Sequence, residues 1–349
     1  MHDASGCNST YNTHDEPRWY DMPSMVFISA LAEVDAILGD DAKLIDDICR
    51  AAEELRPRFI AIAGTPIPMM MGTDFGGVAH LIEQRTGIPT FGFATNGMNS
   101  YNKGATMALA AVARRFCPPD SEVKRDAAAG DAISVNLLGV TPLDFSVTGN
   151  VEAMQKSFAD AGFRVNSCWA MGDSWERLIS AGKADVNVVV SSCGIGLAEV
   201  LREKYRIPAV TGIPVGEAAQ KELFADIRAA AESGRDIDIS APDAAGASFV
   251  VIGEPVQSAS IARALRRDLG IESVSVISPL DFPDEDMIFA RLKNAGTVIA
   301  DPLYRPAVPA GCRFIELPHE GYSGRTFRDR IPLIMGEHFN DWMKKEMSL

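Results

Sequence analysis

The chain has 349 residues, of which 47% are hydrophobic and 23% are charged, a composition typical of a globular protein with a sizeable core. Its 33 Lys and Arg residues against 47 Asp and Glu residues give a formal net charge of −14, which argues against nonspecific nucleic-acid binding and against binding to anionic membranes. No apolar run approaches the roughly 20 residues that a membrane-spanning helix requires.

The cysteines and the first residues predict the cellular setting. The six cysteines have no paired spacing and no Cys-x-x-Cys motif, which is typical of a reduced protein rather than of a disulfide framework. The opening MHDASGCNSTYN lacks the charged and the apolar segments of a signal peptide. We therefore expect a cytoplasmic protein without a zinc ribbon or a thioredoxin-type motif.

Residues 1–125 form the first block of predicted elements. Residues 1–24 are polar and have no helical or strand period, so we expect a loop that packs at an interface. After this loop the pattern predicts helices over 41–55, 74–87 and 103–116 and buried strands in 58–64 and 89–97. The Pro- and Asp-containing segment 117–131 marks a boundary.

Two further blocks repeat this alternation. In residues 126–245 we expect strands in 133–139, 163–170, 184–191 and 207–212 and helices over 151–162, 174–182, 197–206 and 216–234. In residues 246–349 we expect strands in 248–253, 272–278, 297–301 and 312–317 and helices over 257–270 and 284–296. A closing helix over 327–347, with a bend near Pro332, is expected to follow. The alternation predicts the α/β class, with three Rossmann-like domains that have parallel sheets around a central cleft.

Three predicted strands stop at turns whose residues are suited to holding a ligand. These turns are TPIPMMMGTD (65–74), SSCGIG (191–196) and PHEGYSG (318–324). Ligands bind beyond the carboxyl ends of strands in open parallel sheets, because short turns and helix N-termini gather there. The sequence therefore predicts one chamber where the three blocks meet.

The second of these turns centres on Cys193. Gly194 and Gly196 permit a close backbone approach, and a following helix N-terminus lowers the pKa of a thiol and favours anions. Cys193 is therefore a candidate metal ligand, with Gly194 and Gly196 as cofactor-contacting residues. The alternative is a small buried apolar side chain, because the full Gly-x-Gly-x-x-Gly motif is absent.

The third turn centres on His319. A neutral imidazole beside the carboxylate of Glu320 is suited to metal binding or to acid–base catalysis, and the alternative is a histidine hydrogen-bonded within its own turn. Ser323 and Arg325 are predicted to open the last helix and could hold an anionic cofactor there. Arg325 could instead pair with Glu320.

The order of several motifs is similar to that in the nitrogenase component 1 family, which includes the nitrogenase α and β chains, the cofactor-assembly pair and the dark-operative protochlorophyllide reductases. These motifs are HDASGC (2–7), the acidic segment 29–48, AGTPIPMMMGTD (63–74), VNLLG (135–139), EKYRIP (203–208), PVG (214–216) and LPHEGYSG (317–324). The resemblance covers nearly the whole chain.

The resemblance implies an iron–sulfur cluster at a subunit interface. Cys7 matches a cysteine of the family's bridging cluster, whereas Thr65 stands where the family usually has a second cysteine, and a further upstream cysteine is missing. A neutral hydroxyl is a poor iron ligand, and a four-iron cluster generally takes four thiolates. The cluster would thus need a partner chain or further ligands such as His2 and Asp3. The alternative for Cys7 is an exposed thiol.

The resemblance also implies a metal cofactor in the cleft. Ser191 is nearest to the position of a cofactor-ligating cysteine in true nitrogenases, with Cys193 slightly beyond it, and His319 precedes a Tyr-Ser-Gly sequence as a cofactor-ligating histidine does in the nitrogenase α chain. His319, Cys193 and Cys7 are therefore the expected metal ligands. Ser191 and Thr65 are expected to contact a cofactor.

The implied function is that of an oxidoreductase subunit, an oligomer with an identical or related component 1 chain. It would accept electrons from an iron protein and reduce a substrate or cofactor in the interdomain cleft. ATP hydrolysis would belong to the iron protein, because this chain has no Gly-x-x-x-x-Gly-Lys-Ser/Thr loop. One alternative is a non-catalytic scaffold or carrier for metal-cofactor or tetrapyrrole assembly, or a cluster-free regulatory paralogue. Another is a free-standing small-molecule binding protein.

Overall fold

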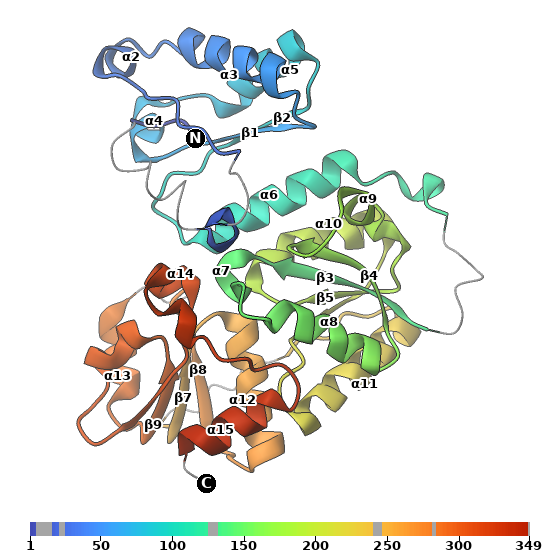
Figure 1. The fold of residues 1–349 in the computed structure, drawn as a ribbon, viewed down its shortest axis with the longest axis vertical. Coiled ribbons are helices and arrows are strands. Elements are labelled where there is room, and N and C mark those ends of the chain that lie inside the picture. Colours follow the sequence, from blue (N-terminus) through green and yellow to red (C-terminus); the bar gives the residue numbers. More distant parts are fainter. Residues whose placement is uncertain (5–15, 21–24, 125–131, 240–245, 281–283, 348–349) are drawn as a thin grey trace. The chain divides into compact units, whose positions relative to one another are not determined.

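The computed structural model describes residues 1–4, 16–20, 25–124, 132–239, 246–280 and 284–347. The chain divides into two compact units, Met1–Ala111 and Val112–Leu349, which are described separately (Figure 1). Within the described residues, no helix is both long enough and apolar enough to cross a membrane.

The first unit is built around two parallel strands, β1 (Ile60–Ala63) and β2 (Thr90–Phe93), in a register that places Ile60 opposite Thr90. Its helical elements are η1 (Pro17–Tyr20), α2 (Glu33–Leu38), α3 (Ala42–Leu55), α4 (Pro66–Met71), α5 (Phe75–Thr86) and the start of α6 (Tyr101–Phe116). The core lies between α3, α5 and β1, where Leu44, Ile82 and Ile62 are buried. Gly92 lets the Phe75 carbonyl pack against β2, because a Cβ there would lie 1.9 Å from that oxygen.

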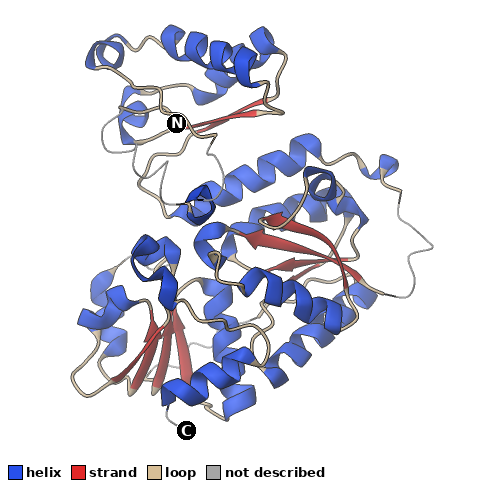
Figure 2. Cartoon of the chain, viewed as in Figure 1, coloured by secondary structure: helices blue, strands red, loops and turns tan. Residues whose placement is uncertain are grey.

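The second unit begins with a four-stranded parallel sheet in the order β4-β3-β5-β6. Its strands are β3 (Ser134–Val140), β4 (Arg164–Ala170), β5 (Val186–Val189) and β6 (Ala209–Thr211). Its helical elements are η2 (Asp120–Glu122), α7 (Pro142–Phe145), α8 (Asn150–Asp160), α9 (Trp175–Ile179), η3 (Ala181–Lys183), η4 (Ser192–Gly194), α10 (Ile195–Tyr205) and α11 (Glu217–Ser233). Helices cover both faces of the sheet (Figures 1 and 2), so β3 is buried along its whole length.

A second four-stranded parallel sheet follows in the order β10-β9-β7-β8. Its strands are β7 (Phe249–Ile252), β8 (Val274–Ile277), β9 (Thr297–Ala300) and β10 (Arg313–Glu316). Its helical elements are α12 (Pro255–Leu269), α13 (Glu285–Leu292), η5 (Pro302–Ala307), α14 (Glu320–Ser323), η6 (Gly324–Arg330) and α15 (His338–Met347). The expected α/β fold with parallel sheets is confirmed.

One apolar core joins the two halves of the second unit. It includes Val188 from β5, Leu223 from α11, Leu265 from α12 and Ile299 from β9. Each sheet also has a point where the chain changes direction, between β3 and β5 in one and between β7 and β9 in the other. The carboxyl ends of strands at such a switch point form a crevice, which is where open α/β sheets bind ligands.

The prediction of a closing helix over 327–347 with a bend near Pro332 was wrong in its extent, because the chain is interrupted at Pro332 rather than bent there. The chain forms η6, passes through an extended stretch and begins α15 only at His338. Pro332 has no backbone N–H to continue a helix. The Asn150 side chain also holds the extended stretch: its Nδ2 donates to the Pro332 carbonyl at 3.0 Å, and its Oδ1 accepts from the Ile334 N–H at 3.1 Å.

Candidate functional site

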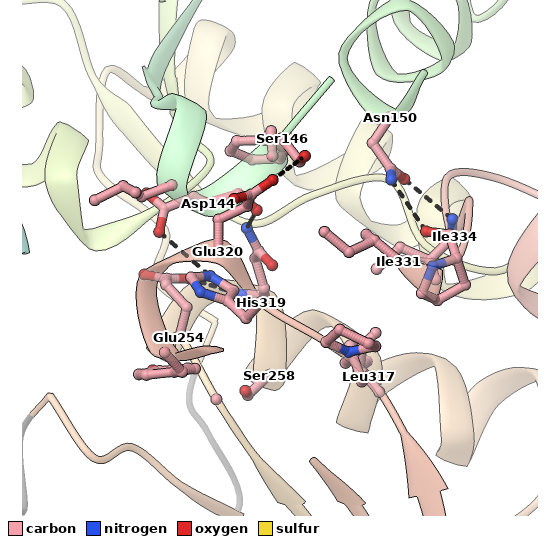
Figure 3. A pocket seen from close by; sticks show the side chains of 18 of the residues that line it. Asp144, Ser146, Asn150, Glu254, Ser258, Leu317, His319, Glu320, Ile331 and Ile334 are labelled. Atoms are coloured by element: carbon pink, nitrogen blue, oxygen red, sulfur yellow. Dashed lines mark hydrogen bonds and ion pairs between the residues drawn. The ribbon is translucent and has the colours of Figure 1, made fainter. Parts of the chain in front are cut away.

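The switch points of the two sheets in the second unit face one another at a cluster of buried polar side chains (Figure 3). Asp144 and Cys193 follow β3 and β5, Glu254 follows β7, and His319 follows β10. Their exposed fractions lie between 0% and 9%. We call these four residues the buried acid cluster.

Asp144 lies at the centre of the buried acid cluster. Thr141 caps the short helix α7, accepting from the Asp144 N–H and donating its own hydroxyl to Asp144 Oδ2 at 2.7 Å. The other oxygen, Oδ1, lies 3.5 Å from Nε2 of His319 in the opposite half. Gln257 of α12 donates its side-chain N–H to the Asp144 carbonyl at 2.9 Å, which holds α7 against the C-terminal half.

Two hydrogen bonds, one at its backbone N–H and one at a ring nitrogen, fix the position of His319. Its N–H donates to Asp301 Oδ2 at 2.8 Å, and its Nδ1 accepts from the Gly321 N–H at 3.0 Å. Because Nδ1 acts as an acceptor, the proton of the neutral imidazole resides on Nε2, the nitrogen that faces Asp144. The ring also lies against Tyr322, with 4.7 Å between the ring centroids.

Glu254 contacts both halves of the second unit. Its Oε2 caps α12 by accepting from the Gln257 N–H at 2.8 Å, and its Oε1 accepts from the Ser192 N–H at 2.6 Å. Burial, followed by the nearby charge of Asp144, raises the pKa of Glu254 to about 8. The carboxyl group therefore keeps its proton near neutral pH.

Cys193 is wholly buried, and its thiol donates to Asp144 and lies near the Ser191 hydroxyl. Burial, followed by the charge of Asp144, raises the pKa of the thiol well above its ordinary range. Ser191 donates its hydroxyl to the Gly139 carbonyl at 2.7 Å. A Cβ on Gly194 would lie 2.4 Å from the Leu138 carbonyl, so this glycine is needed for η4 to pack on β3.

The remaining predicted site residues are not members of the buried acid cluster. Gly196 is buried in the first turn of α10. Ser323 donates its hydroxyl to Asp301 Oδ2 at 2.8 Å, whereas Arg325 is exposed. Thr65 belongs to the first unit, where its hydroxyl donates to the His2 carbonyl at 3.3 Å. Cys7 lies outside the described residues.

One expectation about the third turn needs correction. Ser323 and Arg325 do not open a long helix: they lie where α14 passes into the short η6, so the helix-terminus argument for anion binding no longer applies. Glu320 pairs with Arg328, whose Nε and Nη2 contact the two carboxylate oxygens. Ser146 also donates to Glu320, at 2.7 Å, which joins the two halves.

The sequence reasoning missed Asp144 and Glu254, although each carries a local signal. Thr141-Pro142-Leu143-Asp144 follows a buried strand and has a capping-box pattern. Glu254 precedes Pro255 directly after a strand, an arrangement typical of a helix N-cap followed by proline at the first helical position. Both signals place a carboxylate at the carboxyl end of a strand.

The described residues do not fit a metal cluster at the buried acid cluster. No group of three or more His, Cys, Asp or Glu side chains in this part of the chain could hold a metal ion. Thiolates bind iron, and the surroundings of Cys193 favour the protonated thiol. The adjoining cavity has a volume of about 30 Å³, which is room for about two water molecules.

A protein-family model described as nitrogenase component 1 type oxidoreductase matches residues 1–304. The chain is 27% identical over 187 residues to the nitrogenase molybdenum-iron protein alpha chain of Clostridium pasteurianum, covering 52% of this chain and 33% of that protein. It is 30% identical over 192 residues to the nitrogenase iron-molybdenum cofactor biosynthesis protein NifE of Methanosarcina barkeri, covering 52% and 40%. It is 22% identical over 265 residues to a light-independent protochlorophyllide reductase chain of Ephedra altissima, covering 67% and 52%.

Among solved structures, the chain is similar in fold to the nitrogenase Cp1 structure at pH 6.5. The TM-score is 0.54 with 18% sequence identity, and the match covers 99% of this chain and 67% of that one. The matched regions span between 33% and 52% of the three sequence relatives, so the likeness reaches only part of those proteins.

Proposed function

Because the chain belongs to the nitrogenase component 1 type oxidoreductase family, we propose that it is a subunit of such an oxidoreductase. In this proposal the subunit assembles with an identical or related component 1 chain. It accepts electrons from an ATP-hydrolysing iron protein and directs them to a substrate at the cleft between the halves of the second unit. The protein would act in the cytoplasm.

The observation that supports this role best is the buried acid cluster at the facing switch points. A reductase must add protons as well as electrons, and a general acid works best when its pKa lies near the working pH. Glu254, whose pKa is raised to about 8, holds a proton in that range. Nε2 of His319 carries a second proton 3.5 Å from Asp144, which also accepts from Cys193.

Each member of the cluster then has a distinct task in the proposal. Glu254 stores the proton in a site closed to bulk water, and Asp144 receives protons from its neighbours and passes them on. His319 orients its Nε2–H with the backbone hydrogen bonds at Nδ1 and at its own N–H. Since the described residues do not fit a metal cofactor here, no step is placed on one.

An iron–sulfur cluster shared between subunits through Cys7 remains part of the proposal. Removing this thiolate should lower the iron and the acid-labile sulfide of the anaerobically purified complex. We expect Cys7→Ala to lose most of this iron, and Cys312→Ala to serve as the matched control, because Cys312 is a partly exposed free cysteine that is not among the proposed ligands. Unchanged iron in Cys7→Ala would eliminate Cys7 as a needed ligand.

The non-catalytic alternative is a scaffold or carrier for cofactor assembly. It is favoured by Thr65, whose hydroxyl is already donated to the His2 carbonyl, and by the lack of a three-ligand group within the described residues. One of the relatives, NifE, is named as a cofactor biosynthesis protein. On this reading the complex would bind its partner chain without oxidising an iron protein.

Electron transfer from a reduced iron protein distinguishes the redox function from the scaffold function. The chain, purified anaerobically with its related chain, is mixed with a reduced iron protein, and ATP is added. The proposed oxidoreductase oxidises the iron protein, as followed by its absorbance, and Glu254→Gln slows turnover while leaving the first electron transfer unchanged. A complex that assembles, contains no iron and leaves the iron protein reduced would refute the redox role and favour the scaffold.

A further inference from the structure

A second, larger pocket opens in the C-terminal half, and Tyr322, whose ring lies against His319 of the buried acid cluster, forms part of its wall. It is lined by residues of α13, η5 and α14, the elements that follow β8, β9 and β10 in the chain. Its volume is about 390 Å³, which falls in the range of about 300–1,000 Å³ that is typical of small-molecule sites. All residues that line it belong to the second unit.

Aromatic rings form much of the pocket wall. Tyr304 and Tyr322 meet at 82° with 6.2 Å between their ring centroids, and Phe289 contributes a third ring from α13. Ile288, Leu303, Pro306 and Ala307 complete the apolar part of the lining. Phe289 and Leu303 are 46% and 57% exposed. A ligand that covered these large apolar side chains would remove apolar surface from water, which is favourable. We call this site the aromatic pocket.

Among the described residues, Glu285 is the one charged residue in the lining of the aromatic pocket. Across the described part of the chain, its carboxylate has no ion pair or side-chain hydrogen bond. Burial, followed by the charges of Asp301 and Glu285, raises the pKa of Tyr304 to about 12. The phenol is therefore neutral at physiological pH, and the Glu285 carboxylate lies near enough to Tyr304 for its charge to be felt there.

We propose that the aromatic pocket binds a small organic cation, such as a quaternary or alkylated ammonium group. The negative faces of aromatic rings attract cations, and several rings with one carboxylate are a recurring way to hold a methylated ammonium group. A neutral apolar ligand would cover the same rings but would gain nothing from Glu285. An anion would be repelled by that carboxylate. This inference does not depend on the proposed redox function.

The charge of the ligand can be tested with two probes of equal shape. Choline carries a trimethylammonium group, and its neutral isostere is the dimethylbutanol in which a tert-butyl group replaces it. Binding of both to the full-length protein is measured by isothermal titration calorimetry or by ligand-observed NMR. We expect choline to bind about tenfold more tightly than the isostere. Equal affinities, or no binding of either probe, would overturn the proposal.

Two variants then test which residues cause the preference for choline over its isostere. Phe289→Leu keeps the apolar bulk but removes a ring, and Glu285→Gln removes the charge; both residues are exposed, so the fold should be retained. Each change should reduce the preference for choline to about threefold or less, with little effect on the isostere. Met287→Ala is the matched control, because Met287 is 45% exposed on the same helix and does not line the pocket. A preference that survives both changes would place the cation elsewhere and overturn the assignment.

Discussion

Replacing Glu254 by glutamine should change how the stability of the protein depends on pH. Glutamine resembles the protonated carboxyl group, but it cannot ionise. The pKa of Glu254 is raised from 4.5 to about 8 in the folded protein, chiefly by burial. Between these two values the folded protein binds a proton that the unfolded chain has released, so the free energy of unfolding of the wild type falls as the pH rises.

The size of this effect follows from the two pKa values. Each pH unit within the window contributes about 1.4 kcal/mol, and the whole interval from 4.5 to about 8 corresponds to at most about 5 kcal/mol. Glutamine has a second, pH-independent effect. Both Glu254 oxygens accept backbone N–H groups, from Ser192 and Gln257, and glutamine can replace only one of these acceptors. We expect this loss to cost about 1–3 kcal/mol at every pH.

Urea unfolding of both proteins at several pH values between about 4.5 and about 8 separates the two effects. The variant should be the less stable protein at the acidic end, and the difference should shrink, or change sign, as the pH approaches the upper end. Titrating groups that do not interact with Glu254 are shared by both proteins, so they cancel in the difference, whereas the coupling between Glu254 and Asp144 is part of the measured effect. If that difference stays constant across the window, Glu254 does not keep its proton in the folded state, and the proton-storage role fails with it.

Three further outcomes are expected. Arg328→Met leaves the fully buried Glu320 carboxylate without its cation and should lower the free energy of unfolding by about 3–5 kcal/mol. Adding Glu320→Gln in the same chain should restore part of this loss. A loss under about 1 kcal/mol in urea unfolding would contradict this expectation. Gly194→Ala places a Cβ 2.4 Å from the Leu138 carbonyl and should cost about 1–3 kcal/mol in the same assay, so wild-type stability would contradict the packing described for η4. Cys193→Ser should leave the iron content of the anaerobic complex unchanged, and a clear drop in iron would show that this thiol is a ligand after all.

The alternation of strands and helices could be predicted from sequence because it depends on local signals. Buried parallel strands appear as continuous apolar runs, and glycines end several helices. The course of the chain before the last helix could be predicted only in part. Pro332 indicates a bend from the sequence alone, but the extended stretch there is held by Asn150, a residue from a distant part of the sequence.

The site could be predicted only in outline. The rule that ligand sites form at the carboxyl ends of parallel strands brought attention to Cys193 and His319, and the structure places both beside Asp144. The properties that define the cluster depend on tertiary contacts. Burial of Glu254 and its closeness to Asp144 raise its pKa, and neither is visible in the local sequence.

The buried acid cluster is a costly way to join two halves of a protein. An apolar core that includes Val188 and Leu265 already connects them, and buried ionisable groups usually stabilise less than apolar residues of the same size. A carboxyl group whose pKa is raised to about 8 lowers stability at neutral pH, as the linkage between proton binding and folding requires. Use of this proton in catalysis would explain why a carboxyl group occupies a buried position where it lowers stability.

If the proton of Glu254 is used in catalysis, the pH dependence of turnover can be compared with the pH dependence of stability. If Glu254 supplies the proton during reduction, the pH dependence of turnover must report the same group as the pH dependence of unfolding. Turnover by the wild type should then fall as the pH rises past about 8, and Glu254→Gln should remove that limb of the profile. Two profiles that bend at different pH values would separate the structural role of Glu254 from the chemistry proposed for it.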